Sequence, residues 1–369
     1  MNIKLNDFAK EAQNRGNEYK AAFNRTLSSG YYILGKEVKE FEKEFASYLN
    51  VKYCIGVANG LEALQISLMS LGIGKDDEVI TTPFSAVATT LAILAVHAKP
   101  VFIDVDENGE IDLDLLDKRI NKKTKAVIPV DLYGISCDLE RLEKICKQNK
   151  IFLIEDAAQG HGSVFENKKL GSFGNISCFS FYPTKNLGAI GDGGAIVTNN
   201  ARIASLVYKI RDYGQSSKYL HTEYGLNSRL DEVQAAILRI KLKQLDADNK
   251  KRETLAKEYM KNLTGLEEIN ILDYGRMKFA NFHLLVIKSQ KRNELKNYLK
   301  KKGVQTGIHY PLLIPNQPFM KRVRYRAYEL PEAERMTREV LTLPCHPLMT
   351  KTDVRYVCNN IRTFLRGES

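Results

Sequence analysis

The sequence predicts an α/β protein whose core is a mainly parallel β-sheet covered by helices on both faces. From about residue 53 to residue 198, short apolar runs rich in Ile and Val alternate with amphipathic or apolar helical segments. Such alternation is typical of parallel sheets built from strand–helix units. The chain has 369 residues, more than one hydrophobic core normally serves, which favours a large domain and a smaller one.

Seven apolar runs are the expected strands of the sheet. CIGVA (54–58) and EVITT (78–82) are each followed by a helical segment, and the second of these segments is apolar nearly all round, as in a buried helix. The other five runs are KPVFIDVD (99–106), KAVIPVDLY (125–133), IFLIED (151–156), ISCFSF (176–181) and GGAIVT (193–198). Ligands of such sheets bind at the carboxyl ends of the strands, so we expect the functional residues there.

The pattern changes near residue 240. The stretch 230–263 predicts one or two long helices that leave the sheet. Beyond it we expect a strand in FHLLVIKS (282–289), a helix in 292–303, a strand in VQTGIHY (304–310) and a closing helix in 351–365. We therefore predict a large α/β domain over residues 1–240, which includes a helical N-terminal segment, and a small α+β domain over residues 241–369.

Composition excludes several classes of protein. The formal net charge is +11, but the basic residues are spread along helices rather than concentrated on one tail, with a modest excess in the C-terminal third. Nucleic-acid binding requires such concentration, so we expect no nucleic-acid partner, and at most attraction of a small anionic substrate. The basic residues of that excess are Lys250, Lys251, Arg252, Lys300, Lys301, Lys302, Lys321, Arg322, Arg324 and Arg326.

Membrane, secretory and metal-binding interpretations are not favoured either. No apolar run is long enough to cross a bilayer, and the first residues lack the apolar core of a signal peptide. The six cysteines are scattered without a CxxC pair, which favours buried free thiols in a reducing cytoplasm and predicts no zinc or other metal site.

Three strand ends carry residues suited to chemistry. Asp156 ends IFLIED and is followed by small residues, which leave space beside a carboxylate that is costly to bury. A structural ion pair would explain a lone Asp, but the space indicates a ligand with a basic nitrogen. Asn59-Gly60 ends CIGVA and opens a helix, where free backbone N–H groups can bind a phosphate, although most Asn-Gly pairs are only turns.

Lys185 follows ISCFSF and lies in apolar and aromatic surroundings. Burial should lower the pKa of its amine, and a neutral amine can attack a carbonyl to form a Schiff base; extension to the surface is the structural alternative. The glycines after it (Gly188, Gly191, Gly193 and Gly194) precede a strand and do not open a helix, so they are not a dinucleotide-binding loop. A phosphate turn, an acid and a reactive lysine together are what pyridoxal phosphate requires of a protein.

The longer motifs identify a resemblance. EDAAQGHGS, SFYPTKNLGAIGDGGAIVT and YGLNSRLDEVQAAIL, with KPVFIDVD, TGIHYPL and LPCHPLMT, resemble the DegT/DnrJ/EryC1/StrS family of sugar aminotransferases over nearly the whole chain. The resemblance implies a fold type I transferase with a mainly parallel seven-stranded sheet and a smaller C-terminal α+β domain. It also implies a homodimer with active sites at the subunit interface, pyridoxal 5'-phosphate as cofactor, pyridoxamine phosphate as its intermediate form, and glutamate as amine donor.

The resemblance assigns cofactor contacts to particular residues. Lys185 resembles the lysine bound covalently to the cofactor, Asp156 the partner of the pyridinium nitrogen, and Gln159 the contact of the phenolic oxygen. Ser180 and the Asn59-Gly60 turn resemble the phosphate ligands. Asn227 resembles a residue that reaches the phosphate from the neighbouring subunit.

Other positions match the family more loosely. Many relatives have threonine where this chain has Leu61, so that phosphate contact would be through the backbone. Ala86 stands where many relatives place an aromatic residue over the cofactor ring, and we expect Phe84 to stack there if any residue does. Near the sugar the resemblance implies the residues Tyr182, Arg229, His309 and Tyr310; for Arg229 a structural ion pair is the alternative.

The form GVANGLEAL resembles relatives that aminate carbon 3 of a keto-sugar nucleotide. The substrate we expect is a dTDP-linked 3-oxo-6-deoxyhexose, with a UDP-linked 3-oxo sugar second. Alternatives are an aminotransferase acting at carbon 4 of a UDP- or dTDP-4-keto sugar, a dehydratase of the same fold, and a basic regulatory or DNA-binding protein. Lys185 argues against the dehydratases that have histidine in its place, and the set Lys185, Asp156 and Gln159 argues against a protein without enzymatic function.

Overall fold

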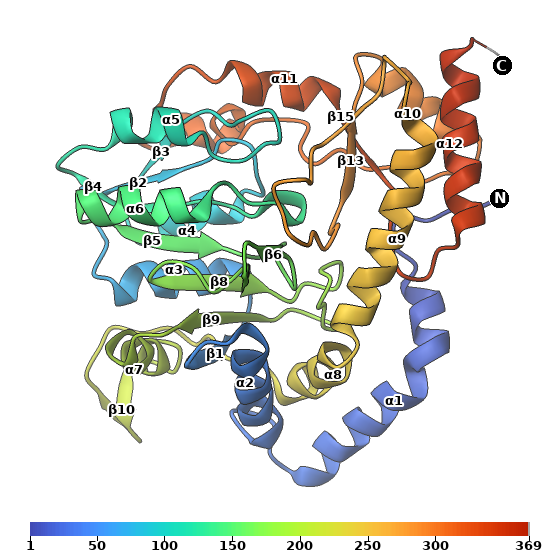
Figure 1. Cartoon of the computed structure of the whole chain (residues 1–369). Helices are drawn as coiled ribbons and strands as arrows, with labels where there is room; N and C mark the ends of the chain where they lie inside the picture. The colour runs from blue at the N-terminus through green and yellow to red at the C-terminus, as the bar shows by residue number, and fades with distance from the viewer. Residues whose placement is uncertain (368–369) are drawn as a thin grey trace.

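The computed structural model describes residues 1–367 and has an eight-stranded sheet at its centre (Figure 1). Its strand order is β1-β9-β8-β5-β4-β2-β3-β14. All neighbouring pairs are parallel except those of β9, which runs antiparallel to both β1 and β8. The strands are β1 (Tyr53–Val57), β2 (Glu78–Thr81), β3 (Lys99–Phe102), β4 (Thr124–Ile128), β5 (Phe152–Asp156), β8 (Ile176–Ser180), β9 (Gly194–Thr198) and β14 (Arg326–Ala327).

The mainly parallel α/β fold is confirmed, but the sheet has one strand more than the seven we predicted. The seven apolar runs all form strands. The eighth, β14, is a two-residue strand from the C-terminal part that pairs in parallel with β3, Arg326 opposite Val101. Its sequence is basic and has no apolar alternation, so no periodicity marks it as a strand.

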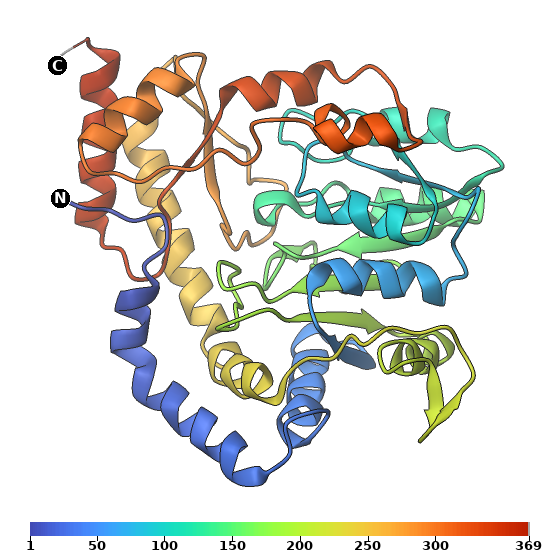
Figure 2. The same ribbon diagram turned by 180° about the vertical axis from the view of Figure 1, so that it is seen from behind.

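Helices cover both faces of the sheet. Side chains of β1, β2, β4, β5, β8 and β9 that point to one face pack against α3, α4 and α7, which lie in front of the sheet in Figure 2 or along its edge. The opposite face packs against α2 and α8 at the β1 end and against α6 and the C-terminal elements elsewhere. These helices are α2 (Lys36–Leu49), α3 (Gly60–Ser70), α4 (Ala88–Ala95), α6 (Leu139–Asn149), α7 (Ala201–Ile210) and α8 (Glu232–Leu242).

The C-terminal part has a small sheet of its own, in the order β12-β13-β15. The stretch predicted as one or two helices is two, because α8 ends at Leu242 and α9 begins at Leu245. The strand predicted in VQTGIHY is wrong, since this segment forms only isolated bridges. These join Val304 to Ile3 and Gly307 to Thr342. The elements of this part are α9 (Leu245–Leu263), β12 (Asn270–Ile271), β13 (Leu285–Lys288), α10 (Arg292–Lys301), α11 (Pro331–Glu339), β15 (Val340–Leu343) and α12 (Lys351–Leu365).

The remaining elements are short or peripheral. Helix α1 (Phe8–Ser29) runs along the outside of the molecule, and the N-terminus lies on the same side as the last helix, α12 (Figure 1). The small pieces are α5 (Leu113–Leu116), β6 (Val164–Phe165), β7 (Lys168–Lys169), β10 (Gln215–Ser217) and β11 (Leu220–His221). None of the described helices is both long and apolar enough to cross a membrane. The domain boundary at residue 240 stays a prediction.

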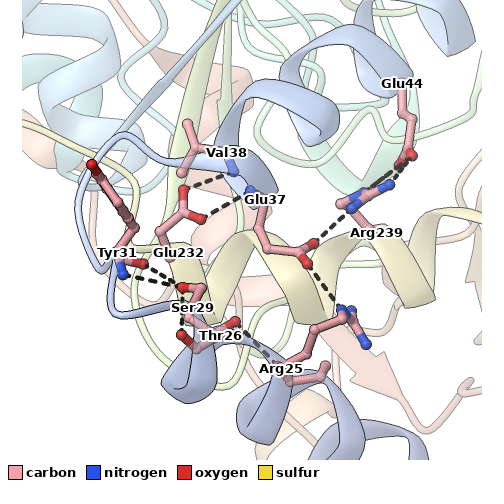
Figure 3. A network of polar contacts seen from close by, with 10 residues as sticks. Arg25, Thr26, Ser29, Tyr31, Glu37, Val38, Glu44, Glu232 and Arg239 are labelled. Atoms are coloured by element: carbon pink, nitrogen blue, oxygen red, sulfur yellow. Dashed lines mark hydrogen bonds and ion pairs between the residues drawn. The ribbon is translucent and has the colours of Figure 1, made fainter.

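A charged network fixes the corner where α1, α2 and α8 meet (Figure 3). Gly35 precedes α2 and provides no side-chain cap, so the carboxylate of Glu232 from α8 accepts hydrogen bonds from the Glu37 and Val38 backbone N–H groups, at 2.9 and 3.0 Å. A Cβ at Gly35 would lie 2.9 Å from that carboxylate. We call Arg25, Glu37, Glu44, Glu232 and Arg239 the corner network.

Candidate active site

Lys185 lies in the loop that follows β8, at the carboxyl edge of the sheet. Its backbone N–H donates to the Tyr182 carbonyl at 2.8 Å, which closes a tight turn around the lysine. Burial lowers the pKa of the Lys185 amine to about 8, while the negative charge of Asp156 raises it. A substantial fraction of this amine is therefore neutral near pH 8, as a nucleophile requires.

The loop closes tightly because of a glycine after Lys185. A Cβ at Gly188 would lie 2.4 Å from the Pro183 carbonyl oxygen and 2.9 Å from that of Tyr182. Backbone therefore packs directly on backbone here, and a side chain would force the two apart.

Asp156 is the last residue of β5 and is 5% exposed. Its Oδ2 accepts a hydrogen bond from the Thr89 hydroxyl at 2.7 Å, and its Oδ1 accepts one from the Ala158 N–H at 3.2 Å. Burial raises the pKa of this carboxyl, whereas these hydrogen bonds and the Lys185 charge lower it. Asp156 can therefore hold a cationic partner, because a buried carboxylate gains most from a nearby positive charge.

Gln159 is held on both its backbone and its side chain. Its Oε1 accepts from the Tyr133 N–H and its carbonyl accepts from the Asn281 side chain, both at 2.8 Å. Burial and the Asp156 charge raise the pKa of the Tyr310 phenol to about 12, while a hydrogen bond with Gln159 lowers it. Tyr310 is thus a neighbour of Gln159 and Asp156, although it is far from both in the sequence.

The phosphate turn has the expected form. Asn59 caps α3, its side chain accepting from the Glu62 N–H at 2.9 Å. Among the described residues, no protein group accepts a hydrogen bond from the Gly60 or Leu61 N–H. A Cβ at Gly60 would lie 2.7 Å from the Ser180 Cβ, so the end of β8 packs directly against the first residue of α3. An α-helix of this length with unused N–H groups beside a hydroxyl suits a phosphate dianion.

A network of three asparagines supports the loops of Lys185 and Gln159. Asn186, next to the lysine, donates to the Asn249 side chain at 2.8 Å and to the Asn281 carbonyl at 3.0 Å. Asn249 on α9 donates to the His161 carbonyl at 2.9 Å. Asn249 and Asn281 are fully buried. We call Asn186, Asn249 and Asn281 the asparagine network; it joins both loops to α9 with neutral groups only.

Three histidines around Lys185 are kept uncharged. Burial, followed by the Lys185 charge, lowers the pKa of His161 to about 3 and that of His283 well below its usual value. The same two causes lower the pKa of His309. His309 is oriented by a 2.8 Å contact between its Nδ1 and the Thr342 hydroxyl and by the Tyr133 hydroxyl, which donates to its carbonyl.

Phe84 does not present a free face to a ligand. Its ring is fully buried and packs edge-on against Tyr310, with centroids 6.4 Å apart. A side chain covered by protein on all sides cannot stack on a cofactor ring, so this placement argues against the stacking that we expected. Phe84 instead supports Tyr310, whereas Ala86, Val87 and Ala88 are the residues of this segment that reach the surface.

In the single chain the Tyr182 and Asn227 side chains are exposed, and the Arg229 side chain has its partner outside this cluster. Tyr182 is 53% exposed, and Asn227 is exposed in a segment that bridges to Asp212. The Arg229 guanidinium forms an ion pair with Asp212 at 3.0 Å, which is the contact that the structural alternative for Arg229 predicts. Their proposed contacts with cofactor or sugar stay predictions.

Sequence reasoning missed several groups that shape the site. Thr89 holds Asp156, Tyr133 holds Gln159 and His309, and the asparagine network holds the loops. Asn186 had one signal, its position next to Lys185. The others had none, because their contacts join segments that only the fold brings together.

The donor set fits pyridoxal phosphate. The α3 N-terminus and Ser180 suit its phosphate, Asp156 its ring nitrogen and Lys185 its aldehyde. Fold and site together define the class of pyridoxal-phosphate-dependent aminotransferases, and comparison with known proteins narrows the class.

Residues 13–362 match the sequence profile of the DegT/DnrJ/EryC1/StrS aminotransferase family. A dTDP-3-amino-3,6-dideoxy-alpha-D-galactopyranose transaminase of Aneurinibacillus thermoaerophilus is 42% identical over 348 residues, or 94% of this chain and 95% of that protein. A dTDP-3-amino-3,4,6-trideoxy-alpha-D-glucose transaminase of Streptomyces venezuelae is 39% identical over 346 residues, or 94% of this chain and 91% of that protein. The crystal structure of S. venezuelae DesV in complex with a ketimine intermediate superposes with a TM-score of 0.94 at 38% identity, covering 97% of both chains.

The chain belongs to the DegT/DnrJ/EryC1/StrS aminotransferase family. It is accordingly a sugar aminotransferase that depends on pyridoxal phosphate, as the sequence predicted. Membership of an aminotransferase family argues against the alternative of a regulatory protein without enzymatic function.

Proposed function

We propose that this enzyme transfers the amino group of glutamate to carbon 3 of a dTDP-linked 3-oxo-6-deoxyhexose, giving a dTDP-3-amino-3,6-dideoxyhexose. The observation that carries the reaction type is the juxtaposition of a Lys185 amine of lowered pKa with the buried Asp156 carboxylate at one edge of the sheet. The printed names of the two relatives above, both of them dTDP-3-amino-sugar transaminases, support the nucleotide and the carbon.

Lys185 carries the proton transfers in this proposal. Pyridoxal phosphate, when bound, supplies an electron sink that makes the neighbouring C–H bond acidic. The neutral Lys185 amine would move the proton from the α-carbon of glutamate to the exocyclic carbon of the cofactor. With the sugar it would take a proton from that carbon and deliver it to carbon 3 of the sugar. The imidazoles of His161, His283 and His309 are uncharged, so the lowered pKa of Lys185 is due to burial and not to a neighbouring cation.

Other residues hold and orient the ligands. The Gly60 and Leu61 N–H groups and the Ser180 hydroxyl bind the phosphate, Asp156 binds the ring nitrogen and Gln159 binds the phenolic oxygen. Thr89 fixes the Asp156 carboxylate in place at 2.7 Å. His309 and Tyr310 face the same space as Gln159, which favours them as sugar contacts; Tyr182 is exposed at its entrance in this assignment.

We propose further that the enzyme acts as a homodimer. Side chains of the β10–β11 hairpin and its flank are exposed although apolar, Tyr219 by 81%, Leu220 by 57% and Tyr224 by 84%. Exposed apolar groups of this size mark interaction surfaces. Asn227 follows this hairpin, so in a dimer formed through this surface Asn227 of one copy would reach the cofactor phosphate of the other. Arg229, with its partner Asp212, would lie at the same interface.

The experiment that tests the proposal is an amination assay with glutamate and a panel of dTDP- and UDP-linked 3-oxo and 4-oxo sugars. We expect product only from 3-oxo sugars, fastest with dTDP. The purified protein should carry a pyridoxal phosphate absorbance band that glutamate bleaches, and Lys185→Ala protein should lack the band formed with the lysine. A preference for 4-oxo sugars would overturn the regiochemistry, and a Lys185→Ala protein with an unchanged band would overturn the assignment of the lysine.

A further inference from the structure

An open groove lies at the amino edge of the sheet, opposite the edge that carries Lys185. It has a volume of about 980 Å³ and is found where β2, β3 and β4 begin. Four segments distant in the sequence line it, residues 75–78, 94–99, 121–123 and 323–326. None of them contributes to the site described above.

The groove is strongly basic. Its lining includes the cations Lys75, Lys99, Lys122, Lys123, Arg324 and Arg326, against the acids Asp76 and Glu78. This set contains two of the basic residues of the C-terminal third, Arg324 and Arg326, that the proposed function does not use. The convergence of four segments makes one concentrated basic surface out of residues that look dispersed along the sequence.

Of the two acids that line the groove, the buried one, Glu78, already has cationic partners. Glu78 is 1% exposed, and its carboxylate contacts Lys99 at 3.4 Å, Arg326 at 3.0 Å and the Asn121 amide at 2.8 Å. Within residues 1–367 no ion pair involves Lys75, Lys122, Lys123 or Arg324. Four cations therefore face the groove without an acidic partner, and mutual repulsion makes an anion favourable there.

The groove also has an apolar wall. Tyr325 is half-buried, and its ring packs edge-on against the buried Phe102, with centroids 5.9 Å apart. Leu94, Ala98 and Val323 lie beside it. An anion alone would use only the cations, whereas a ligand with a flat ring and a phosphate tail would use both parts.

We propose that this groove binds a nucleoside di- or triphosphate, with its base on the Tyr325 wall and its phosphates between Lys123 and Arg324. Charged hydrogen bonds from lysine and arginine to phosphate oxygens supply the affinity. The volume is in the range of small-molecule sites. The proposal does not depend on which sugar the enzyme aminates, because the two sites lie on opposite edges of the sheet.

The test is calorimetric titration of the holoenzyme with ADP and, separately, with inorganic pyrophosphate. In the holoenzyme the cofactor occupies the phosphate turn at α3. The variants are Lys123→Glu with Arg324→Glu in the groove, Tyr325→Leu on its wall, and Lys300→Glu with Lys301→Glu as the matched control. The control pair lies on the exposed end of α10 and changes the net charge by the same amount.

We expect one ADP per chain, weakened about tenfold or more by the groove pair and unchanged by the control pair. Tyr325→Leu should weaken ADP and leave pyrophosphate unchanged. Amination activity should be the same in all variants, which verifies that they are folded. The proposed site would be overturned if ADP showed no saturable binding at millimolar concentration, or if the groove pair and the control pair weakened binding equally. The proposal that the ligand is a nucleotide would be overturned if Tyr325→Leu affected the binding of ADP and pyrophosphate equally.

Discussion

Two polar networks hold this molecule together, and they differ in charge. The asparagine network below Lys185 consists of amides and backbone groups, and two of its three side chains are fully buried. The corner network at α1, α2 and α8 consists of carboxylates and guanidinium groups near the surface, with 22% of the Arg239 side chain exposed. Both networks join elements that are distant in the sequence.

The difference follows from what each region has to keep constant. A charge placed beside Lys185 would move its pKa, and burial would make that charge expensive. Neutral amides can tie the Lys185 loop to α9 without either effect. Asp156 is then the acid that raises the pKa of Lys185, and its position is fixed by Thr89. At the corner no group needs a particular pKa, so ion pairs serve as well.

The first and largest expected effect concerns the pKa of Lys185. We predict that the apoprotein reacts with pyridoxal phosphate at a rate that rises with pH and reaches half its maximum near pH 8. At that pH the neutral fraction of Lys185 exceeds that of an ordinary lysine by more than about a hundredfold. Stopped-flow absorbance of the cofactor band measures the rate.

Asp156→Asn should move this midpoint to lower pH, because the carboxylate stabilises the ammonium form of Lys185 and the amide does not. Glu44→Gln in the corner network is the control and should leave the midpoint unchanged. Two outcomes would contradict this explanation of the Lys185 pKa. One is a midpoint near the pKa of an ordinary lysine, and the other is a midpoint that does not move in Asp156→Asn.

The sequence predicted the strand ends better than it predicted what supports them. Asp156, Gln159 and Ser180 could be found because each lies in or beside an apolar strand within a long motif. Thr89 and Asn281 could not, because their roles come from contacts across 67 and 122 positions of the chain, respectively. Phe84 was misjudged for a related reason: its burial against Tyr310 depends on where the C-terminal segment packs, which no local pattern records.

The second prediction removes a member of the asparagine network. Asn281→Leu keeps the branched shape of the side chain but leaves the Gln159 carbonyl without its 2.8 Å donor and the His283 N–H without its acceptor. We expect the free energy of unfolding to fall by about 3 kcal/mol, as for buried groups that lose their partners, with little dependence on salt. Urea denaturation measures the loss.

Asn297→Leu is the matched control for this substitution. Asn297 is exposed on α10, so the same exchange there should change stability by no more than about 0.5 kcal/mol. Equal losses in the two variants would mean that the network contributes no more than a surface asparagine does.

The smallest effect is expected in the corner network. Arg239 donates in fork geometry to Glu44, with distances of 2.7 to 3.1 Å, and to Glu37 at 2.7 Å. Arg239→Met keeps much of the packing of the side-chain stem and removes the charge. Glu37 retains Arg25 as a partner, and Glu44 can turn to water, so we expect a loss of about 1 kcal/mol.

Salt separates this loss from that of Asn281→Leu. At 1 M salt the screening (Debye) length is about 3 Å, so a partly exposed ion pair is strongly screened. The stability lost in Arg239→Met should therefore shrink toward zero between low and high salt, while the stability lost in Asn281→Leu should stay the same. Urea denaturation of both variants at the two salt concentrations makes the comparison. If both losses are insensitive to salt, the corner network stabilises by packing and hydrogen-bond geometry rather than by charge, and the two networks differ less in physics than in composition.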